Sequence, residues 1–241
     1  MIEKTRGIIL NQIKYTDSGI IARVYTRNFG RQSVLIRGMR KKKTGKHNIL
    51  FQPLFILDLE MNYKPSRELQ NLREFSVSYS PSGIFSDIKK GSVSIFLGEV
   101  LTSVLMEESP NEELFNYLEE SIIYFDKSTE NYANFHIAFL AGLTSFLGFE
   151  PGRRNNADDK FFDMKNGSFL PIPPVHGNYV NEEISVILAD FFIASFETAS
   201  KITLKGAMRN EVLETLLRYY SFHLPGIKKI NSLEVLKEVF G

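Results

Sequence analysis

The chain has 241 residues, of which 43% are hydrophobic and 24% are charged, a balance typical of a soluble globular protein with one or two domains. No apolar run approaches the roughly 18 residues needed to cross a bilayer, and no secretory signal is visible, so we expect a cytoplasmic protein without membrane contact. The absence of cysteine excludes disulfides, thiolate nucleophiles and every zinc site built on cysteine.

Charge is distributed unevenly along the chain, although the formal net charge is only +1. Residues 1–80 carry 15 Lys and Arg residues against 6 Asp and Glu residues, a balance of +9. Residues 81–241 carry 14 against 22, a balance of −8. This division predicts two electrostatically different modules, and the positive module is a candidate for binding a polyanion.

The first 80 residues show the period-two alternation of β-strands. Segments 20–27 and 31–37 flank a turn at 28–30, which predicts a hairpin with one buried face and one open face. The residues expected inward are Ile20, Ala22, Val24, Gln32, Val34 and Ile36. The residues expected on the open face are Ile21, Arg23, Tyr25, Arg27, Arg31, Ser33, Leu35 and Arg37. Further strands are expected near 5–14, 54–62 and 69–79, which favours a five-stranded closed barrel of the OB type, although a split sandwich also fits the pattern.

From Pro81 the hydrophobic period changes to 3.6 residues, which predicts a mostly α-helical module, as in a bundle. Helical stripes occupy 96–105, 114–125, 135–147, 182–199, 207–222 and 232–239. Asn111 is the expected N-cap of the second stripe. Residues 149–180 are expected to form an irregular insertion with short strands at 161–162 and 169–170. The predicted fold class is therefore α+β and multidomain, with an OB-type domain over 1–80 and a helical domain over 81–241.

No enzymatic constellation stands out in the sequence. The histidines are dispersed, without metal-binding spacing, at His47, His136, His176 and His223. Neither a glycine-rich phosphate loop nor a nucleophile elbow is present. Asp158, Asp159 and Asp163 could hold a divalent ion, but they lie in a Gly/Asn-rich loop, where acidic residues commonly solvate a turn. The sequence therefore predicts a protein that is not an enzyme and leaves a metal-dependent nuclease as a minor alternative.

The strongest local signal is the basic segment 37–46, which places six cations in ten residues without an acid. It follows a strand pair whose open face carries further arginines beside Tyr25. A lone charge run commonly only solvates a surface, but cations around an aromatic ring suit a nucleic-acid backbone and an unstacked base. The predicted DNA-binding residues are Arg23, Tyr25, Arg27, Arg31, Arg37, Arg40, Lys41, Lys42, Lys43 and Lys46.

The C-terminal segment 209–226 predicts an amphipathic helix with an aromatic end. Its apolar residues are expected to pack in the core. Exposed basic and aromatic side chains around an apolar groove could, in addition, receive an acidic–hydrophobic peptide tail. The residues of this hypothesis are Arg209, Arg218, Tyr219 and His223.

Eight short motifs, in this order and spacing, resemble the RecO family of bacterial recombinational repair proteins over nearly the whole chain. They are TRGIIL at 5–10, YTDS at 15–18, YTRNFGR at 25–31, RGMR at 37–40, FQPL at 51–54, LGFEP at 147–151, LRYYSFHL at 217–224 and SLEVL at 232–236. The resemblance implies an N-terminal OB fold and a helical domain with a small zinc-finger-like insertion between its helices.

The resemblance also implies a function. Members of this family bind single- and double-stranded DNA, anneal complementary strands and work with RecR. Together these partners help RecA load onto DNA coated by single-strand-binding protein, whose acidic C-terminal tail docks on the helical domain. A nucleoid-associated cytoplasmic protein is therefore expected, and an RNA-binding OB adaptor remains the alternative.

One feature departs from the family pattern. Many members carry four cysteines in the region 150–180, whereas this chain has none, so no zinc or other cofactor is expected. We expect an apolar staple in place of the metal. Its residues are Phe161, Phe162, Phe169 and Leu170.

Overall fold

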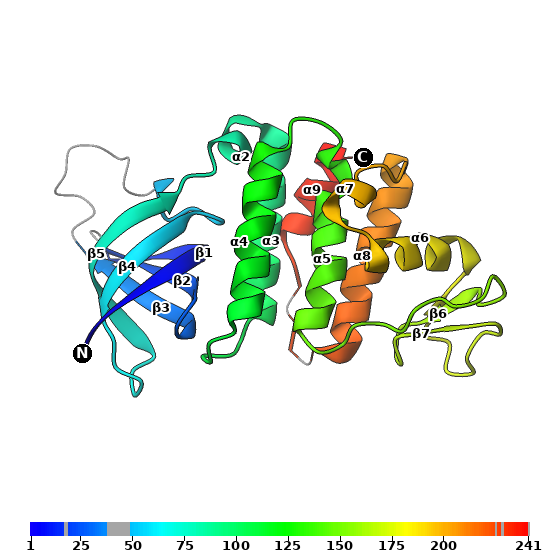
Figure 1. Cartoon of the computed structure of the whole chain (residues 1–241), viewed down its shortest axis with the longest axis horizontal. Coiled ribbons are helices and arrows are strands. Elements are labelled where there is room, and N and C mark those ends of the chain that lie inside the picture. The colour runs from blue at the N-terminus through cyan, green and yellow to red at the C-terminus, as the bar shows by residue number, and fades with distance from the viewer. Residues whose placement is uncertain (17–18, 38–48, 225, 228, 241) are drawn as a thin grey trace. The chain divides into compact units, whose positions relative to one another are not determined.

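The computed structural model describes the chain except for residues 17–18, 38–48, 225, 228 and 241. Its N-terminal part is a closed barrel whose strands follow the hydrogen-bonded order β1-β2-β3-β5-β4 (Figure 1). The strands are β1 (Ile2–Thr16), β2 (Gly19–Thr26), β3 (Gly30–Arg37), β4 (Ile56–Asn62) and β5 (Leu69–Tyr79). The predicted OB-type barrel is confirmed, and closure of the sheet excludes the split sandwich.

Strand β1 is long enough to pair with two neighbouring strands, which allows the barrel to close. Residues 2–8 pair with β4, and residues 7–16 pair with β2, with an irregularity in the register between Ile9 and Asn11. A bulge of this kind bends a strand, so that one strand can serve two partners along its length. The short parallel contact of β3 with β5 completes the ring.

The barrel core follows the predicted alternation. Its buried residues are Ile9, Ala22, Val24, Val34, Ile36, Phe51, Phe55, Leu57, Leu59 and Met61. The inward prediction is also confirmed for Gln32, which is buried and satisfies its side-chain amide by donating to the carbonyl oxygen of Phe29 at 2.7 Å. A buried polar group without such a partner would cost free energy.

Two residues expected on the open face are buried, so this part of the prediction was wrong. Tyr25 is 3% exposed and Leu35 is 6% exposed. The ring of Tyr25 points out of the barrel but stacks against Phe115 of helix α4 (Glu112–Lys127), with 6.4 Å between ring centroids. A side chain that leaves the barrel here therefore enters a second apolar layer instead of water.

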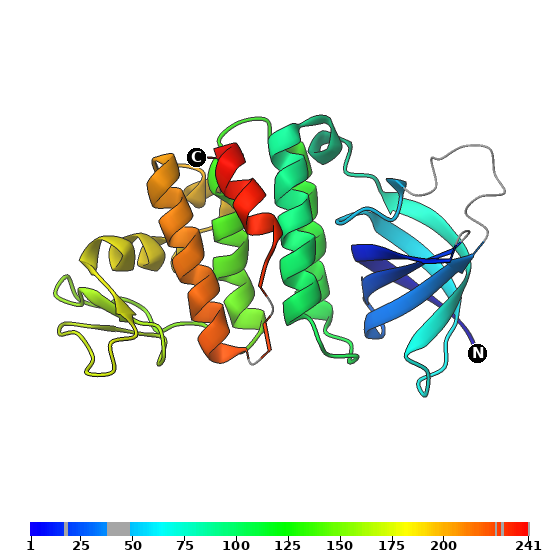
Figure 2. The ribbon, with the colours of Figure 1, turned by 180° about the vertical axis from the view of Figure 1, so that it is seen from behind.

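Helices α2 (Ser82–Ser86), α3 (Ile88–Val104) and α4 belong to the same compact unit as the barrel, which comprises Met1–Lys127 and Ile230–Leu236. Figures 1 and 2 show α3 and α4 side by side. Asn111 accepts a hydrogen bond from the Leu114 N–H at 2.9 Å, which confirms the predicted cap of α4. At the other end of α4, the buried Lys90 ammonium donates to the carbonyl oxygens of Phe125 and Asp126, where a cation complements the helix dipole.

The second compact unit comprises Ser128–Lys229 and the residues from Lys237 onward. Its helices are η1 (Tyr132–Asn134), α5 (Phe135–Phe146), α6 (Glu182–Ile193), α7 (Phe196–Ala199) and α8 (Gly206–His223). The single helix expected over 182–199 is divided, because Ser195 adopts an extended conformation and accepts a hydrogen bond from the Thr198 N–H as the cap of α7. The last helix, α9 (Ser232–Phe240), agrees with the predicted 232–239.

The insertion contains a small antiparallel sheet in the order β7-β6-β8. Strands β6 (Phe161–Asp163) and β7 (Ser168–Leu170) confirm the two short strands expected there, and β8 (Tyr179–Val180) was not predicted. The change from strands to helices falls at Pro81, whereas the compact units divide the chain after Lys127. Within the described part of the chain, none of the helices combines the length and apolar content that crossing a membrane demands.

Gly30 is a position where the fold requires glycine. Its φ is +59°, and an added Cβ would lie 2.5 Å from the Ser109 carbonyl oxygen and 2.7 Å from that of Glu107. We expect Gly30→Ala to lower the free energy of unfolding by about 2–4 kcal/mol, from backbone strain and the displaced segment. Urea denaturation measures this change.

Gly91→Ala is the matched control. Gly91 lies inside α3, and its added Cβ would meet no atom closer than the Ile84 carbonyl oxygen at 3.9 Å. Alanine in a helix interior gains about 0.5–1 kcal/mol over glycine, so this variant should be as stable as the native chain or more stable. Equal effects of the two substitutions would contradict the role given to Gly30.

Candidate nucleic-acid interface

The ten residues predicted to bind DNA do not share one environment. Five of them lie outside the described residues, namely Arg40, Lys41, Lys42, Lys43 and Lys46. The described five are Arg23, Tyr25, Arg27, Arg31 and Arg37. The surroundings of these five decide which of them could meet a ligand.

Arg27 is held by α4. Its Nη1 donates to Glu112 at 3.1 Å, and its Nη2 donates to Asn116 at 2.9 Å and to Glu119 at 3.2 Å. Its guanidinium carbon also lies 4.7 Å from the centroid of the Phe115 ring. Charge-assisted hydrogen bonds together with a cation–π contact fix the side chain against the helix. The face of the barrel that the sequence predicts to be open at Arg27 is therefore partly covered by α4.

Arg6 was not among the predicted residues, yet it belongs to the same cluster. Its Nε donates to Asp58 at 3.0 Å, and its Nη1 donates to Glu119 at 3.1 Å. The hydrogen bond to Asp58 is the main reason why the pKa of Arg6 lies above its usual value. Arg6 and Arg27 therefore share one carboxylate, that of Glu119. We call Arg6, Arg27, Glu112 and Glu119 the α4 ion-pair cluster.

Tyr25 and Arg31 also have internal roles. Burial, with a smaller contribution from Glu107, raises the pKa of Tyr25 to about 12, and its ring is covered by Phe115. The predicted open-face position of Tyr25 was therefore wrong, and the hypothesis that its ring stacks a base loses its support. The backbone N–H of Arg31 donates to the Glu107 carbonyl oxygen at 3.0 Å, and its side chain contacts the sulfur of Met106.

Arg23 and Arg37 remain as cations of the β2–β3 surface. Arg23 is partly exposed and lies between Asn11 and Ser33 on the neighbouring strands. Arg37 is exposed at the end of β3 and is the first residue of the basic segment. Among the described residues, neither side chain forms an ion pair. The charge of this surface is therefore available to a polyanion.

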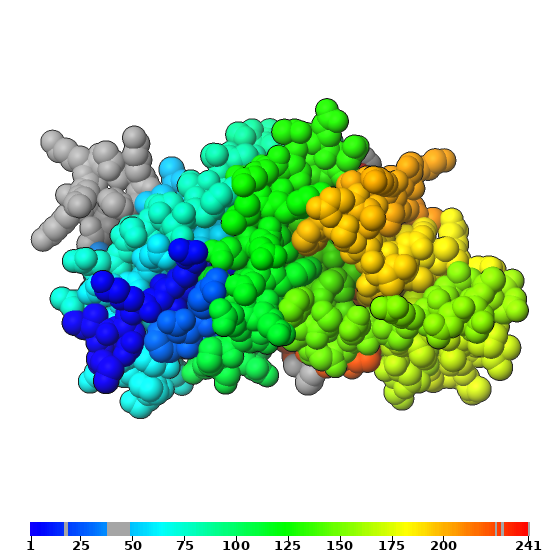
Figure 3. Space-filling model, viewed as in Figure 1, coloured from blue at the N-terminus to red at the C-terminus, as the bar shows by residue number. Residues whose placement is uncertain are grey.

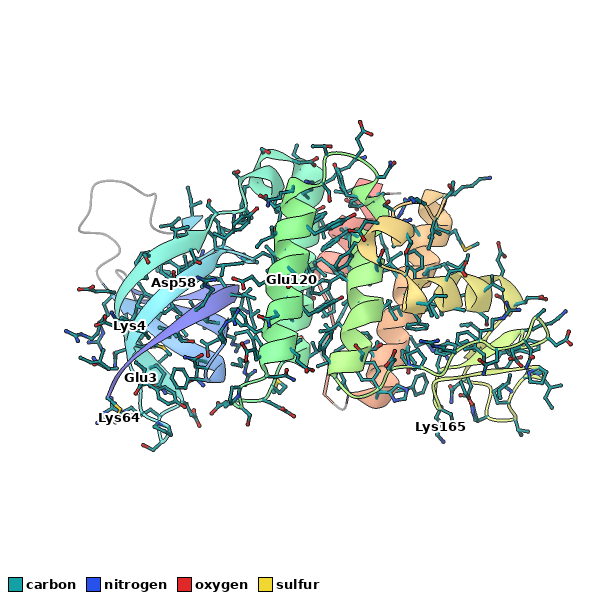
Figure 4. All side chains as sticks on the ribbon, in the orientation of Figure 1. Glu3, Lys4, Asp58, Lys64, Glu120 and Lys165 are labelled. Atoms are coloured by element: carbon teal, nitrogen blue, oxygen red, sulfur yellow. The ribbon has the colours of Figure 1, made fainter. Side chains whose placement is uncertain are left out.

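A groove of about 520 Å³ opens on the β1–β4–β5 side of the barrel. Its lining residues are Lys4, Thr5, Arg6, Arg27, Asn28, Asp58, Leu59, Glu60, Glu74, Phe75 and Ser76. Figure 4 labels Lys4 and Asp58 on this part of the barrel, and Figure 3 shows β1 in dark blue beside the cyan of β4 and β5. Cations and acids alternate along its walls, as in the pair of Lys4 and Glu60 at 3.7 Å. A balanced set of charges attracts a polyanion less than a uniform basic surface does.

The four residues of the peptide-tail hypothesis are mostly engaged in the second unit. Tyr219 is 1% exposed and donates to the Phe149 carbonyl oxygen at 2.6 Å, so its expected exposure was wrong. His223 stacks on Phe149, with 5.3 Å between ring centroids. Arg209 donates to Asn134 and to the Leu204 carbonyl oxygen. Arg218 is exposed, so it is the member whose charge is available to a partner.

The insertion is organised around Asp163, whose side chain is 2% exposed. Its carboxylate accepts hydrogen bonds from the backbone N–H groups of Lys165 and Asn166 and from the Asn166 side chain. His176 contacts it through Nε2 at 3.1 Å, while His176 Nδ1 accepts from the Asn178 N–H. The accepting Nδ1 places the proton of a neutral imidazole on Nε2, which therefore donates to Asp163.

The donor set of the insertion does not fit a zinc ion. No thiolate is available, and within the described ranges no three side chains of His, Asp or Glu converge as a metal site would require. Instead, Phe162 is fully buried, with its ring centroid 4.8 Å from that of Phe169 and 5.1 Å from that of Tyr219. Phe162 and Phe169, two of the four residues of the expected apolar staple, therefore pack against each other.

Comparison with known proteins covers the whole chain. The family model described as "Recombination protein O N terminal" matches residues 1–81, and the one described as "Recombination protein O C terminal" matches residues 85–234. The DNA repair protein RecO of Phocaeicola vulgatus is 35% identical over 240 residues, and that of Bacteroides fragilis is 35% identical over 242 residues. The corresponding protein of Porphyromonas gingivalis is 31% identical over 244 residues. Each alignment covers 100% of both chains.

The Asp163 carboxylate predicts an acid-dependent loss of stability. Burial alone raises the pKa of Asp163, but the hydrogen bonds from Asn166, Lys165 and His176 outweigh it and hold the pKa below its usual value. The ionised carboxylate therefore stabilises the fold at neutral pH, and this contribution disappears as the pH falls below about 4, through the lowered pKa. Asp163→Asn should lower the free energy of unfolding at pH 7 by about 1–3 kcal/mol and reduce its dependence on acid.

Denaturation at pH 7 and at pH 3 tests this expectation. Asp158→Asn is the control, because Asp158 is exposed in the same insertion and its substitution removes the same charge. If both variants follow the native pH profile, Asp163 does not hold the insertion together.

Proposed function

The chain belongs to the RecO family of DNA repair proteins, and on this premise we propose that it is a non-enzymatic, DNA-binding mediator of recombinational repair in the bacterial cytoplasm. It binds single- and double-stranded DNA and anneals complementary strands. With RecR it helps to load RecA onto DNA coated by single-strand-binding protein. The observation that carries the proposal is the full-length match to relatives named as DNA repair proteins.

We assign the DNA contact to the β2–β3 surface and the segment that continues from it. Arg23 and Arg37 are available on the described part of this surface, and the sequence adds five cations between residues 40 and 46. Such a set neutralises phosphates without reading bases, so the affinity should depend on salt and little on sequence. Two strands held on one positive surface repel each other less, which favours annealing.

The acidic tail of single-strand-binding protein would dock on the helical part, where the exposed Arg218 is the available charge. An RNA-binding adaptor shares these electrostatics, and competition between matched RNA and DNA oligonucleotides separates it from the DNA mediator. The nuclease alternative has less support, because the carboxylate of Asp163 already accepts four hydrogen bonds within the insertion.

Replacing Arg40, Lys41 and Lys42 together by alanine tests the DNA contact. We expect the affinity for a single-stranded oligonucleotide to fall between several-fold and roughly a hundredfold at moderate salt. The slope of log affinity against log salt should lose about 0.7 for each phosphate contact removed. Fluorescence anisotropy titrations over a range of salt concentrations measure both quantities.

The control variant replaces Lys165, Lys201 and Lys205 by alanine. These three lysines are exposed and lie in the second unit, and their replacement removes three positive charges, as the test variant does. If the control and the test variant lower the salt slope equally, the basic segment is not the contact surface.

The mediator function itself is tested by annealing. Complementary DNA strands, each coated with single-strand-binding protein, should anneal faster when the chain is added, because it holds both strands on one positive surface. A gel or fluorescence-quenching assay follows the reaction. An unchanged rate at saturating protein would contradict the proposed function.

A further inference from the structure

We propose that Arg6 and Arg27 form a second phosphate-binding site, which the carboxylates of α4 occupy when no nucleic acid is bound. This inference rests on the proposed function and adds to it Arg6, which the sequence did not predict, and the competition of Glu119 for both arginines. The ligand is the phosphodiester backbone of a nucleic-acid strand. Glu119 is the residue that controls access to the site.

The geometry of Glu119 resembles that of a bound phosphate. Its Oε1 accepts from Arg6 at 3.1 Å, and its Oε2 accepts from Arg27 at 3.2 Å. One anionic group therefore presents two oxygens to two guanidinium groups. The non-bridging oxygens of a phosphodiester make the same kind of charge-assisted contact with arginine.

The two arginines can be reached from outside the cluster. Both line the groove of about 520 Å³, together with Lys4 and Asn28. The side chains of Arg6 and Arg27 are 40% and 31% exposed, whereas that of Glu119 is 16% exposed. A strand entering the groove would thus meet both guanidinium groups, whereas Glu119 is not among the residues that line it.

The ion pairs of this cluster join side chains that are all at least partly exposed. Pairs between partly exposed side chains are weak and are screened by salt. Glu112, whose side chain is 72% exposed, contributes a contact that solvent already competes for. A strand carries one negative charge on each nucleotide and releases counterions on binding, so it competes with such carboxylates more strongly than a single anion does.

The acids of the groove limit what can bind there. Asp58 also holds Arg6, and Glu60 and Glu74 lie opposite each other on β4 and β5. These charges would repel a strand that lies deep in the groove. The site therefore accepts phosphates at the edge formed by Arg6 and Arg27, and the internal carboxylates lower its affinity instead of abolishing it.

Glu119→Gln tests the proposal against the control Glu120→Gln. The two residues are adjacent on α4, where Figure 4 labels Glu120, and both substitutions remove one negative charge. Glu120 is exposed and, within the described residues, forms no ion pair. We expect Glu119→Gln to raise the affinity for a single-stranded oligonucleotide about three- to tenfold, and Glu120→Gln less than twofold. The salt slope of Glu119→Gln should increase by about 0.7 to 1.4, for one or two new phosphate contacts.

A double-mutant cycle identifies the residues that produce the gain. Arg27→Gln should weaken binding more in the Glu119→Gln background than in the native chain, because the Glu119 carboxylate no longer competes there with phosphate for the guanidinium. Thermal unfolding of every variant reports whether α4 still packs on the barrel. If Glu119→Gln does not fold, Glu112→Gln takes its place, with an expected gain of about twofold over Glu120→Gln.

The outcomes separate this inference from the function on which it rests. Equal affinities of folded Glu119→Gln and Glu120→Gln, or additive effects in the cycle, would mean that Glu119 only fastens α4 to the barrel. In that case the basic-segment variant would still lose binding, and the proposed function would stand. If the native chain binds no oligonucleotide at low salt, the proposed function fails first, and the second site fails with it.

Discussion

The contact between the barrel and α4 determines which side chains of the barrel reach the surface. Tyr25 and Arg27 leave the barrel on the same side, and both meet Phe115. Glu119 then joins Arg27 to Arg6 on the neighbouring strand. Because this contact uses two arginines of the barrel, less of the positive charge near β2 and β3 is open to a polyanion than the sequence suggests, and Arg23 and Arg37 are part of what remains.

The fold was predictable because it depends on local periodicity. The hairpin expected over 20–27 and 31–37 forms as Gly19–Thr26 and Gly30–Arg37, since alternation of apolar residues directly specifies a strand with one buried face. The division between α6 and α7 was missed because the apolar period continues across Ser195. A serine three residues before Thr198 was the available signal for a new helix start.

The candidate site was predictable only in part, because ion pairing joins residues that are far apart in the sequence. The balance of +9 over residues 1–80 counts Arg6 and Arg27 as available, although their partner Glu119 lies about a hundred residues later. A signal did exist in the composition of α4, which carries five acids and one lysine. An acidic amphipathic helix following a basic barrel indicates that part of the positive charge is neutralised within the protein.

Asp163 and Glu119 show how burial divides similar carboxylates into two functions. Asp163 accepts from two backbone N–H groups of its own turn and from the Asn166 and His176 side chains, and its 2% exposure closes it off from an incoming ligand. Glu119 accepts from the side chains of Arg6 and Arg27, so exchange for another anion requires movement of side chains and leaves the backbone in place. Backbone donors and deep burial make the first carboxylate structural, whereas the second, whose ion-pair partners are side chains, is the one that another anion can replace.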